Sequence, residues 1–224
     1  MINNADVKDF IEDNSDEKQK EYLDLLITNS NSTSEKIDKL SLVIGSVVVL
    51  YFIADLKIVS SISLGSVIIS DLSIAKLFTP LVFSFLLLRY ALLNAHKAML
   101  VKSIQAIGIN YFTIRNAEEQ KLWSNPFLQL ILPFSFWESL TYMYFRNDNK
   151  QKCMSYLLTL PTFPIILSPF IFEYYALKSL IAEHWHYDPL VKIVVVLTIW
   201  ILLAVLYYYY CLYNINRSIN SEKV

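Results

Sequence analysis

Four long hydrophobic runs separated by polar segments dominate the pattern of this sequence. A helix that crosses a membrane needs about 20 predominantly apolar residues. We expect transmembrane helices at residues 40–56, 77–95, 153–175 and 193–213. The first is short and reaches the required length only if Asp55 lies at the interface. The pattern predicts an all-α membrane protein with four transmembrane helices, spread over a transmembrane domain of residues 35–213.

Two further segments are ambiguous. Residues 58–71 alternate serine with aliphatic residues around Gly65-Ser66, which predicts a β-hairpin on the outer face or a continuation of the second span. Residues 127–145 are apolar and aromatic but contain Pro133 and Glu138. A fifth span there would place the basic residues that follow it outside, so we expect an interfacial or re-entrant helix on the cytoplasmic side.

Residues 1–34 form an acidic segment that we place in the cytoplasm. Phe10 and Ile11 fit one short helix, and Ser15 fits the cap of a second helix that carries apolar residues at helical spacing. The residues of this apolar stripe are Tyr22, Leu25 and Leu26. The stripe is too short to be stable alone, so it needs a partner surface, either a second copy or the loops of the chain.

A linker is expected at residues 29–31. Ser32 and Glu35 then match a capping box, which predicts a new helix that runs into the first span. Within that span Ser41 and Gly45 lie four residues apart, a spacing of small residues that lets membrane helices approach closely. In the second span, Pro80 fits the first helical turn, where its missing N–H costs nothing.

Composition supports the membrane interpretation. Of the 224 residues, 55% are hydrophobic and 17% are charged, and the net charge is −1, so no global field attracts nucleic acid or acidic substrates. The two cysteines, Cys153 and Cys211, show no disulfide or metal-binding spacing. The first thirty residues are polar, without the basic and then apolar pattern of a cleavable signal peptide.

The distribution of positive charge predicts the orientation. With four spans, both termini in the cytoplasm place most of the 19 Lys and Arg residues inside, including those of the 214–224 tail. Four lysines are left outside: Lys57, Lys76, Lys178 and Lys192. Because inner loops are enriched in Lys and Arg, we expect a multi-pass protein of a bacterial inner membrane with both ends cytoplasmic.

Charged residues near the spans are candidates for a pore or gate. Arg89 lies inside the second span, either reaching the inner headgroups or pairing with a buried anion or carboxylate. Asp55 and Glu173 lie near outer span ends, where each alone is an interfacial, solvated acid. In a symmetric oligomer they would repeat as rings of carboxylates, which attract cations.

Prolines interrupt the third span. Each removes a backbone donor, so this helix is expected to be kinked or broken, either as a static kink or as a hinge that lines a cavity. These gate candidates are Pro161, Pro164 and Pro169.

Basic and aromatic residues alternate through the long middle segment. Such a surface binds nucleotides or single-stranded nucleic acid, faces anionic lipid, or docks the acidic N-terminal segment. The candidate ligand or partner residues are Lys97, Lys102, Arg115, Lys121, Arg146, Lys150 and Lys152. His184 and His186 lack a third ligand nearby, so no metal is expected, and the absence of enzyme motifs predicts neither catalysis nor a cofactor.

The layout resembles that of the small multi-pass membrane effectors of bacterial anti-phage defence operons. The likeness lies in the acidic start (Asp6 to Asp24), the four spans, the short outer hairpin and the basic-aromatic inner loop, not in a residue motif. It implies a homo-oligomeric channel or pore in the lipid bilayer, gated from the cytoplasm by a nucleotide or oligonucleotide signal. The alternative is a non-conducting membrane scaffold or sensor that recruits a soluble cytoplasmic partner.

Overall fold

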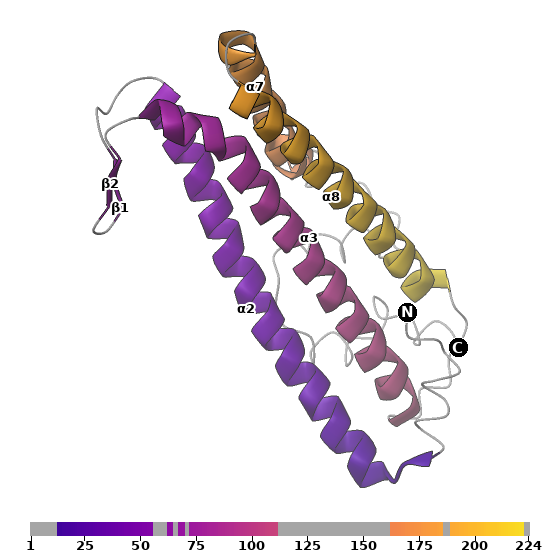
Figure 1. Ribbon diagram of the computed structural model, residues 1–224. Helices are drawn as coiled ribbons and strands as arrows, with labels where there is room; N and C mark the ends of the chain where they lie inside the picture. The colour runs from indigo at the N-terminus through magenta and orange to yellow at the C-terminus, as the bar shows by residue number, and fades with distance from the viewer. Residues whose placement is uncertain are drawn as a thin grey trace. The chain divides into compact units, whose positions relative to one another are not determined.

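The computed structural model describes residues 13–55, 62–64, 67–69, 72–111, 162–185 and 189–221. Within these residues four helices follow one another, α2 (Asp16–Asp55), α3 (Leu72–Tyr111), α7 (Thr162–His184) and α8 (Pro189–Ser221) (Figure 1). Two short strands, β1 (Ile62–Leu64) and β2 (Val67–Ile69), lie between α2 and α3.

Three helical segments have the length and composition of membrane spans. They are Asp16–Asp55, Lys76–Gly108 and Pro189–Asn214, and they contain the predicted spans at 77–95 and 193–213 and nearly all of the span at 40–56. The prediction of a membrane protein is therefore supported at this level. Large apolar side chains remain exposed along these helices, including Leu42, Val82 and Trp200, the last with 73% of its surface accessible.

The predicted fold class, with four transmembrane helices and an outer β-hairpin, is wrong as it stands. The described part of the predicted 153–175 span begins at Thr162. Helix α7 carries the charged residues Glu173, Lys178 and Glu183, and it is not among the three described helices that are long and apolar enough to cross a membrane. No complete hairpin is seen in the described residues. β1 and β2 are three residues each and pair antiparallel with Ile62 opposite Ile69, while residues 65–66 between them are not described. The interfacial or re-entrant helix predicted at 127–145 lies outside the described residues.

The N-terminal part of α2 differs from the prediction. The helix begins directly after Ser15, whose carbonyl accepts the hydrogen bond from the Gln19 N–H at 3.0 Å, as expected of a capping residue. The linker at 29–31 and the new start at Ser32 are wrong, because α2 is continuous from Asp16 to Asp55. The buried Thr33 is accommodated within this helix because its hydroxyl donates to the Asn29 carbonyl at 2.8 Å.

The start of α3 is also earlier than predicted. The helix begins at Leu72, so Pro80 lies inside it and not in its first turn. At the other end α3 continues past the apolar run and extends to Tyr111.

The chain divides into two compact units. Unit 1 comprises Met1–Ile37, Leu93–Thr162 and Tyr209–Val224, and unit 2 comprises Asp38–Leu92 and Phe163–Tyr208. In unit 1 the buried positions of α2 alternate by three and four residues, the spacing of a helix that packs along one face. These positions are Gln19, Leu23, Leu26, Ser30, Thr33 and Ile37, and Ser34 beside Thr33 is buried as well.

The core of unit 1 joins α2 to α3. Leu23 and Leu26 pack with Leu100, Ile104 and Ile107. The predicted stripe therefore has its partner surface in α3, but Leu26 alone of its three members is buried. Tyr22 and Leu25 remain exposed.

Replacing Ile104 by Ala should lower the stability of unit 1 by about 2–5 kcal/mol, because Ile104 is completely buried and its removal leaves a cavity. Denaturant unfolding of the detergent-solubilised chain, followed by circular dichroism, measures the effect. Met99→Ala on the same helix is the control, since Met99 is exposed and should cost little. Equal losses in both variants would contradict the assigned core.

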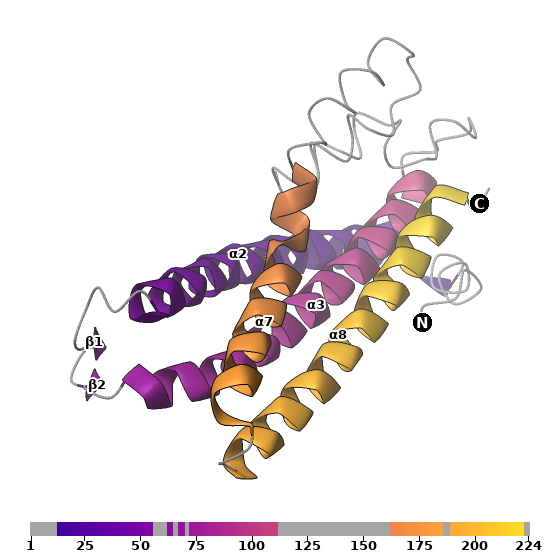
Figure 2. The same cartoon turned by 90° about the horizontal axis from the view of Figure 1, so that it is seen from above.

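Unit 2 is held by two clusters. Leu180 of α7 packs with Val191, Val194 and Val195 of α8, and Leu77 and Leu81 of α3 lie against them. Figure 2 shows α7 and α8 side by side, joined by the short segment between His184 and Pro189. The second cluster is aromatic and forms part of the candidate site.

Candidate functional site in unit 2

Aromatic rings join three helices of unit 2. Phe172 of α7 lies 4.5 Å from Phe83 of α3 and 5.1 Å from Tyr51 of α2, measured between ring centroids. Both contacts are edge-to-face, the arrangement that aromatic pairs prefer. Phe83 is completely buried, so these rings fix the level at which α2, α3 and α7 meet.

An ion pair lies at the end of α2. The Lys76 Nζ is 2.6 Å from Asp55 Oδ1, and the Tyr175 hydroxyl donates to Asp55 Oδ2 at 3.3 Å. Both charged side chains keep about a fifth to a quarter of their surface accessible. Asp55 is thus a paired acid at a helix end. In a symmetric oligomer, a ring of Asp55 carboxylates would therefore be accompanied by a ring of Lys76 ammonium groups.

Glu173 is the unexpected member of the site. Only 1% of its surface is accessible, and neither carboxyl oxygen has a hydrogen-bond partner within the described residues. The prediction of a solvated acid at the interface is therefore wrong. Its position in the sequence suggested a span end, whereas the packing of α7 turns this side chain towards the interior.

Helix geometry identifies the surface that Glu173 faces. At 3.6 residues per turn, Glu173 points between the directions of Leu177 and Leu180, and away from that of Tyr175. Leu177 and Leu180 belong to the cluster formed with α8 and α3, whereas Tyr175 contacts Asp55 of α2. Glu173 therefore lies on the side of α7 that packs on α8 and α3.

Two buried hydroxyl groups accompany it on those helices. Thr198 of α8 is completely buried and its Oγ1 has no hydrogen-bond partner in the described part of the chain. Ser84 of α3, also completely buried, donates to the Leu81 carbonyl at 2.9 Å. The sequence analysis missed both, although Thr198 is a polar residue within the otherwise apolar run of α8.

The other gate candidates lie apart from this site or outside the described residues. Arg89 is exposed on α3. Pro164 and Pro169 lie within α7, which is one helix from Thr162 to His184 and is not broken there. Pro161 precedes the described part of α7.

The basic candidates are mostly outside the described residues. Lys97 and Lys102 lie on α3 in unit 1, and Lys97 is buried with 8% of its surface accessible. Structure is not described for the rest, which are Arg115, Lys121, Arg146, Lys150 and Lys152.

Among the described side chains of residues 13–55, 72–111, 162–185 and 189–221, no three His, Cys, Asp or Glu residues come together as a metal site would require. The described part of unit 2 contains one buried acid and the buried hydroxyl groups of Ser84 and Thr198, on helices that are largely apolar.

Comparison of the chain with protein-family models, with curated proteins and with solved structures found no match. The class that fold and site define is a helical membrane protein with a buried acid between its helices.

Proposed function

We propose that this chain is a channel or pore-type effector of the bacterial inner membrane, assembled from several copies and opened from the cytoplasmic side. The observation that carries the proposal is the buried, unpartnered carboxyl group of Glu173 among apolar helices. An ionisable group at membrane depth is costly and marks an ion or proton pathway more often than a structural position.

The surface of α2 supports assembly. Ser41 and Gly45 lie on an exposed face, and a Cβ added at Gly45 would meet no atom within 4 Å. Small residues four apart let two membrane helices approach closely, and van der Waals packing then stabilises the pair. We propose this face as a contact between copies. Defence against phage, with a nucleotide or oligonucleotide as the signal, is proposed from the sequence resemblance.

Ion flux from liposomes tests the proposal. The purified chain, reconstituted at rising protein-to-lipid ratios, should release a trapped cation and should run as an oligomer in mild detergent. Gly45→Trp should reduce both, because the large side chain prevents close approach. Val43→Trp, at an exposed site on the opposite face of the same helix, should change neither. The proposal would be contradicted if the chain stayed monomeric and released no cation at any protein-to-lipid ratio, even after cell extract was added as a source of the cytoplasmic signal.

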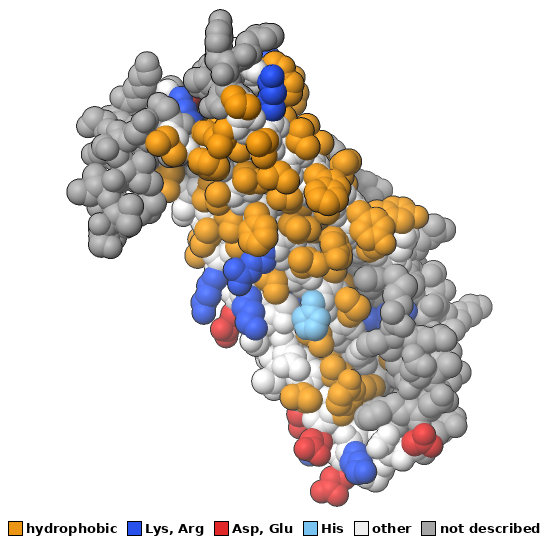
Figure 3. Space-filling view, in the orientation of Figure 1, with side chains coloured by type: hydrophobic (Ala, Val, Ile, Leu, Met, Phe, Trp, Pro, Cys, Tyr) orange, Lys and Arg blue, Asp and Glu red, His pale blue; other side chains and the backbone are white. Residues whose placement is uncertain are grey.

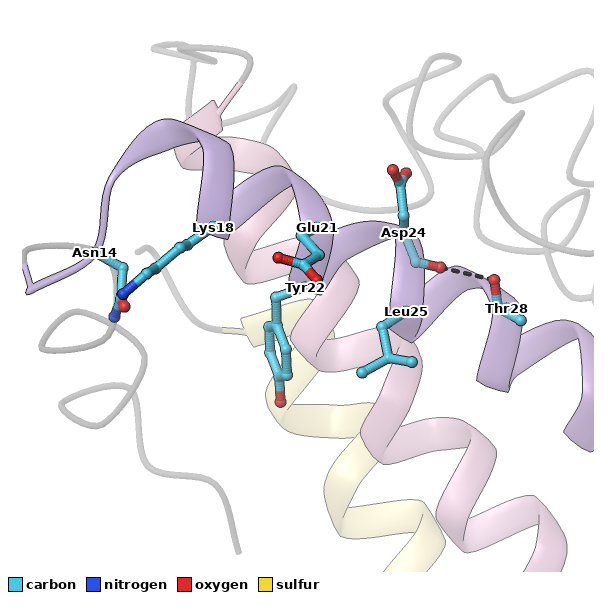
Figure 4. A pocket seen from close by; sticks show the side chains of 7 residues that line it. All are labelled: Asn14, Lys18, Glu21, Tyr22, Asp24, Leu25 and Thr28. Carbon is cyan, nitrogen blue, oxygen red and sulfur yellow. Dashed lines mark hydrogen bonds between the residues drawn. The ribbon is translucent and has the colours of Figure 1, made fainter.

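A second candidate function is a scaffold that binds a soluble partner. It is favoured by a hollow of about 540 Å³ on one face of α2 in unit 1, where Tyr22 and Leu25 are exposed (Figure 4). The lining residues are Asn14, Lys18, Glu21, Tyr22, Asp24, Leu25 and Thr28. Two results together would favour this function over the channel. The chain would be a monomer that does not conduct ions but captures a soluble partner, and the Leu25→Asp variant would lose that partner.

A further inference from the structure

Glu173 and Thr198 lie at the same level of unit 2. Leu180 and Val191 belong to one packed cluster, close to the turn that joins α7 and α8. Glu173 comes seven residues before Leu180, and Thr198 comes seven residues after Val191. Seven residues are about two helical turns, or about 10 Å of rise, and return to the same face of a helix. Counted from the cluster that contains Leu180 and Val191, Glu173 and Thr198 therefore lie at the same depth, on the surfaces that α7 and α8 turn towards each other.

A second register places Ser84 near this level. Phe83 contacts Phe172 at 4.5 Å between ring centroids, and Ser84 and Glu173 are the next residues along α3 and α7. The site thus draws oxygen atoms from α7, α8 and α3. The Ser84 hydroxyl is already bonded within its own helix, so Glu173 and Thr198 are the members without partners among the described residues.

The charged groups of the neighbouring helices are engaged elsewhere or exposed. On α8 the run from Ile193 to Tyr213 carries no charge, and Lys192 lies over the Trp185 ring at 5.8 Å. On α3, Lys76 pairs with Asp55 of α2, and Arg89 is exposed. No described cation therefore compensates a negative charge on Glu173.

The number of oxygen atoms at this site argues against a divalent cation and favours a proton. Divalent cations such as Ca²⁺ and Mg²⁺ take six or more oxygen ligands. Here the unpartnered atoms are two carboxyl oxygens and one hydroxyl oxygen. Burying an unpaired carboxylate in an apolar interior is very costly, and one proton removes that charge.

We propose that Glu173 and Thr198 form a proton-binding site between α7 and α8. Glu173 holds the proton on a carboxyl oxygen. The two side chains are not hydrogen-bonded to each other in the structure, and a change of side-chain rotamer lets the Thr198 hydroxyl accept the hydrogen bond from the protonated carboxyl group. On release, the proton passes to water and leaves a carboxylate that is stable only if water enters between the helices. Proton binding itself does not depend on the proposed channel. Its consequence, coupling of proton release to opening, rests on that function.

Labelling with dicyclohexylcarbodiimide tests the site in the full chain reconstituted in liposomes. This apolar reagent adds to protonated carboxyl groups in apolar surroundings. Mass spectrometry of the peptide that contains residue 173 should find the adduct, formed more slowly as the pH is raised. Glu173→Gln should remove this adduct, whereas Asp38→Asn, at an exposed acid of α2 outside the site, should leave it unchanged.

Thr198→Val provides a finer readout. Loss of the accepting hydroxyl should lower the ratio of protonated to ionised Glu173 about fivefold at a given pH, and so move the pH midpoint of labelling downwards. No adduct at residue 173 at any pH, or labelling at a rate independent of pH, would overturn the proposal. Protection by Na⁺ at constant pH would overturn it in favour of a metal-cation site. Labelling without any ion flux would contradict the channel and leave the proton site standing.

Discussion

Replacing Leu203 by Arg should sharply reduce the amount of chain that is stably inserted in the membrane. Leu203 lies near the middle of α8, and 57% of its surface is exposed, so the structure offers no protein partner that would hide a charge there. An arginine at the centre of a transmembrane helix costs about 2.5–3.5 kcal/mol on insertion scales. The fraction that resists alkaline extraction from membranes measures the loss.

Leu25→Arg is the matched control. Leu25 is exposed to a similar extent, 53%, but lies on α2 in unit 1 beside polar residues. Arginine should be tolerated there. In a protein dissolved in water both exposed leucines would accept a charge equally well, so equal behaviour of the two variants would count against a membrane location for α8.

Phe83→Ala should produce the largest loss of stability among single truncations in unit 2. Phe83 is completely buried and its ring contacts Phe172, so its removal opens a cavity where α3 meets α7. We expect a loss of about 3 kcal/mol, the lower end of the range for a buried Phe, because lipid reduces the difference in transfer free energy but not the lost packing. Thermal unfolding in detergent measures it.

Phe85→Ala on the same helix is the control for this experiment. Its side chain is 58% exposed, so truncation should change the unfolding temperature little. If Phe85→Ala destabilised the protein as much as Phe83→Ala, the assignment of the buried face of α3 would be wrong.

The apolar runs were predictable because hydrophobicity and the absence of charge are local properties. The spans at 77–95 and 193–213 lie within the α3 and α8 segments of the structure. Figure 3 shows hydrophobic side chains gathered over one part of the described surface, with charged side chains concentrated away from it. The helix through Ser30 was not predicted, because a serine between two asparagines is typical of a linker. Its burial on the repeating face of α2 becomes visible only when α3 is present.

The candidate site was predicted only in part. Glu173 was identified as a candidate, but its burial depends on how α7 packs on α8, which no local pattern records. Asp55 and Lys76 lie on either side of residues 58–71, for which the sequence left two alternatives, so their pairing could not be predicted. The hydrogen bond from Tyr175 to Asp55 joins residues 120 positions apart, which no local pattern reveals. Thr198 could have been found from the spacing of polar residues in an apolar helix.

The claim on which the rest depends is that the exposed apolar faces of these helices lie in lipid. Single cysteines at Val196, Trp200, Leu203 and Leu25, in a chain whose own cysteines are replaced by serine, test it directly in intact membranes. A water-soluble maleimide should label Leu25→Cys readily and leave the three α8 variants unlabelled until detergent is added. Rapid labelling of all four before detergent would show that α8 is surrounded by water and would contradict the account.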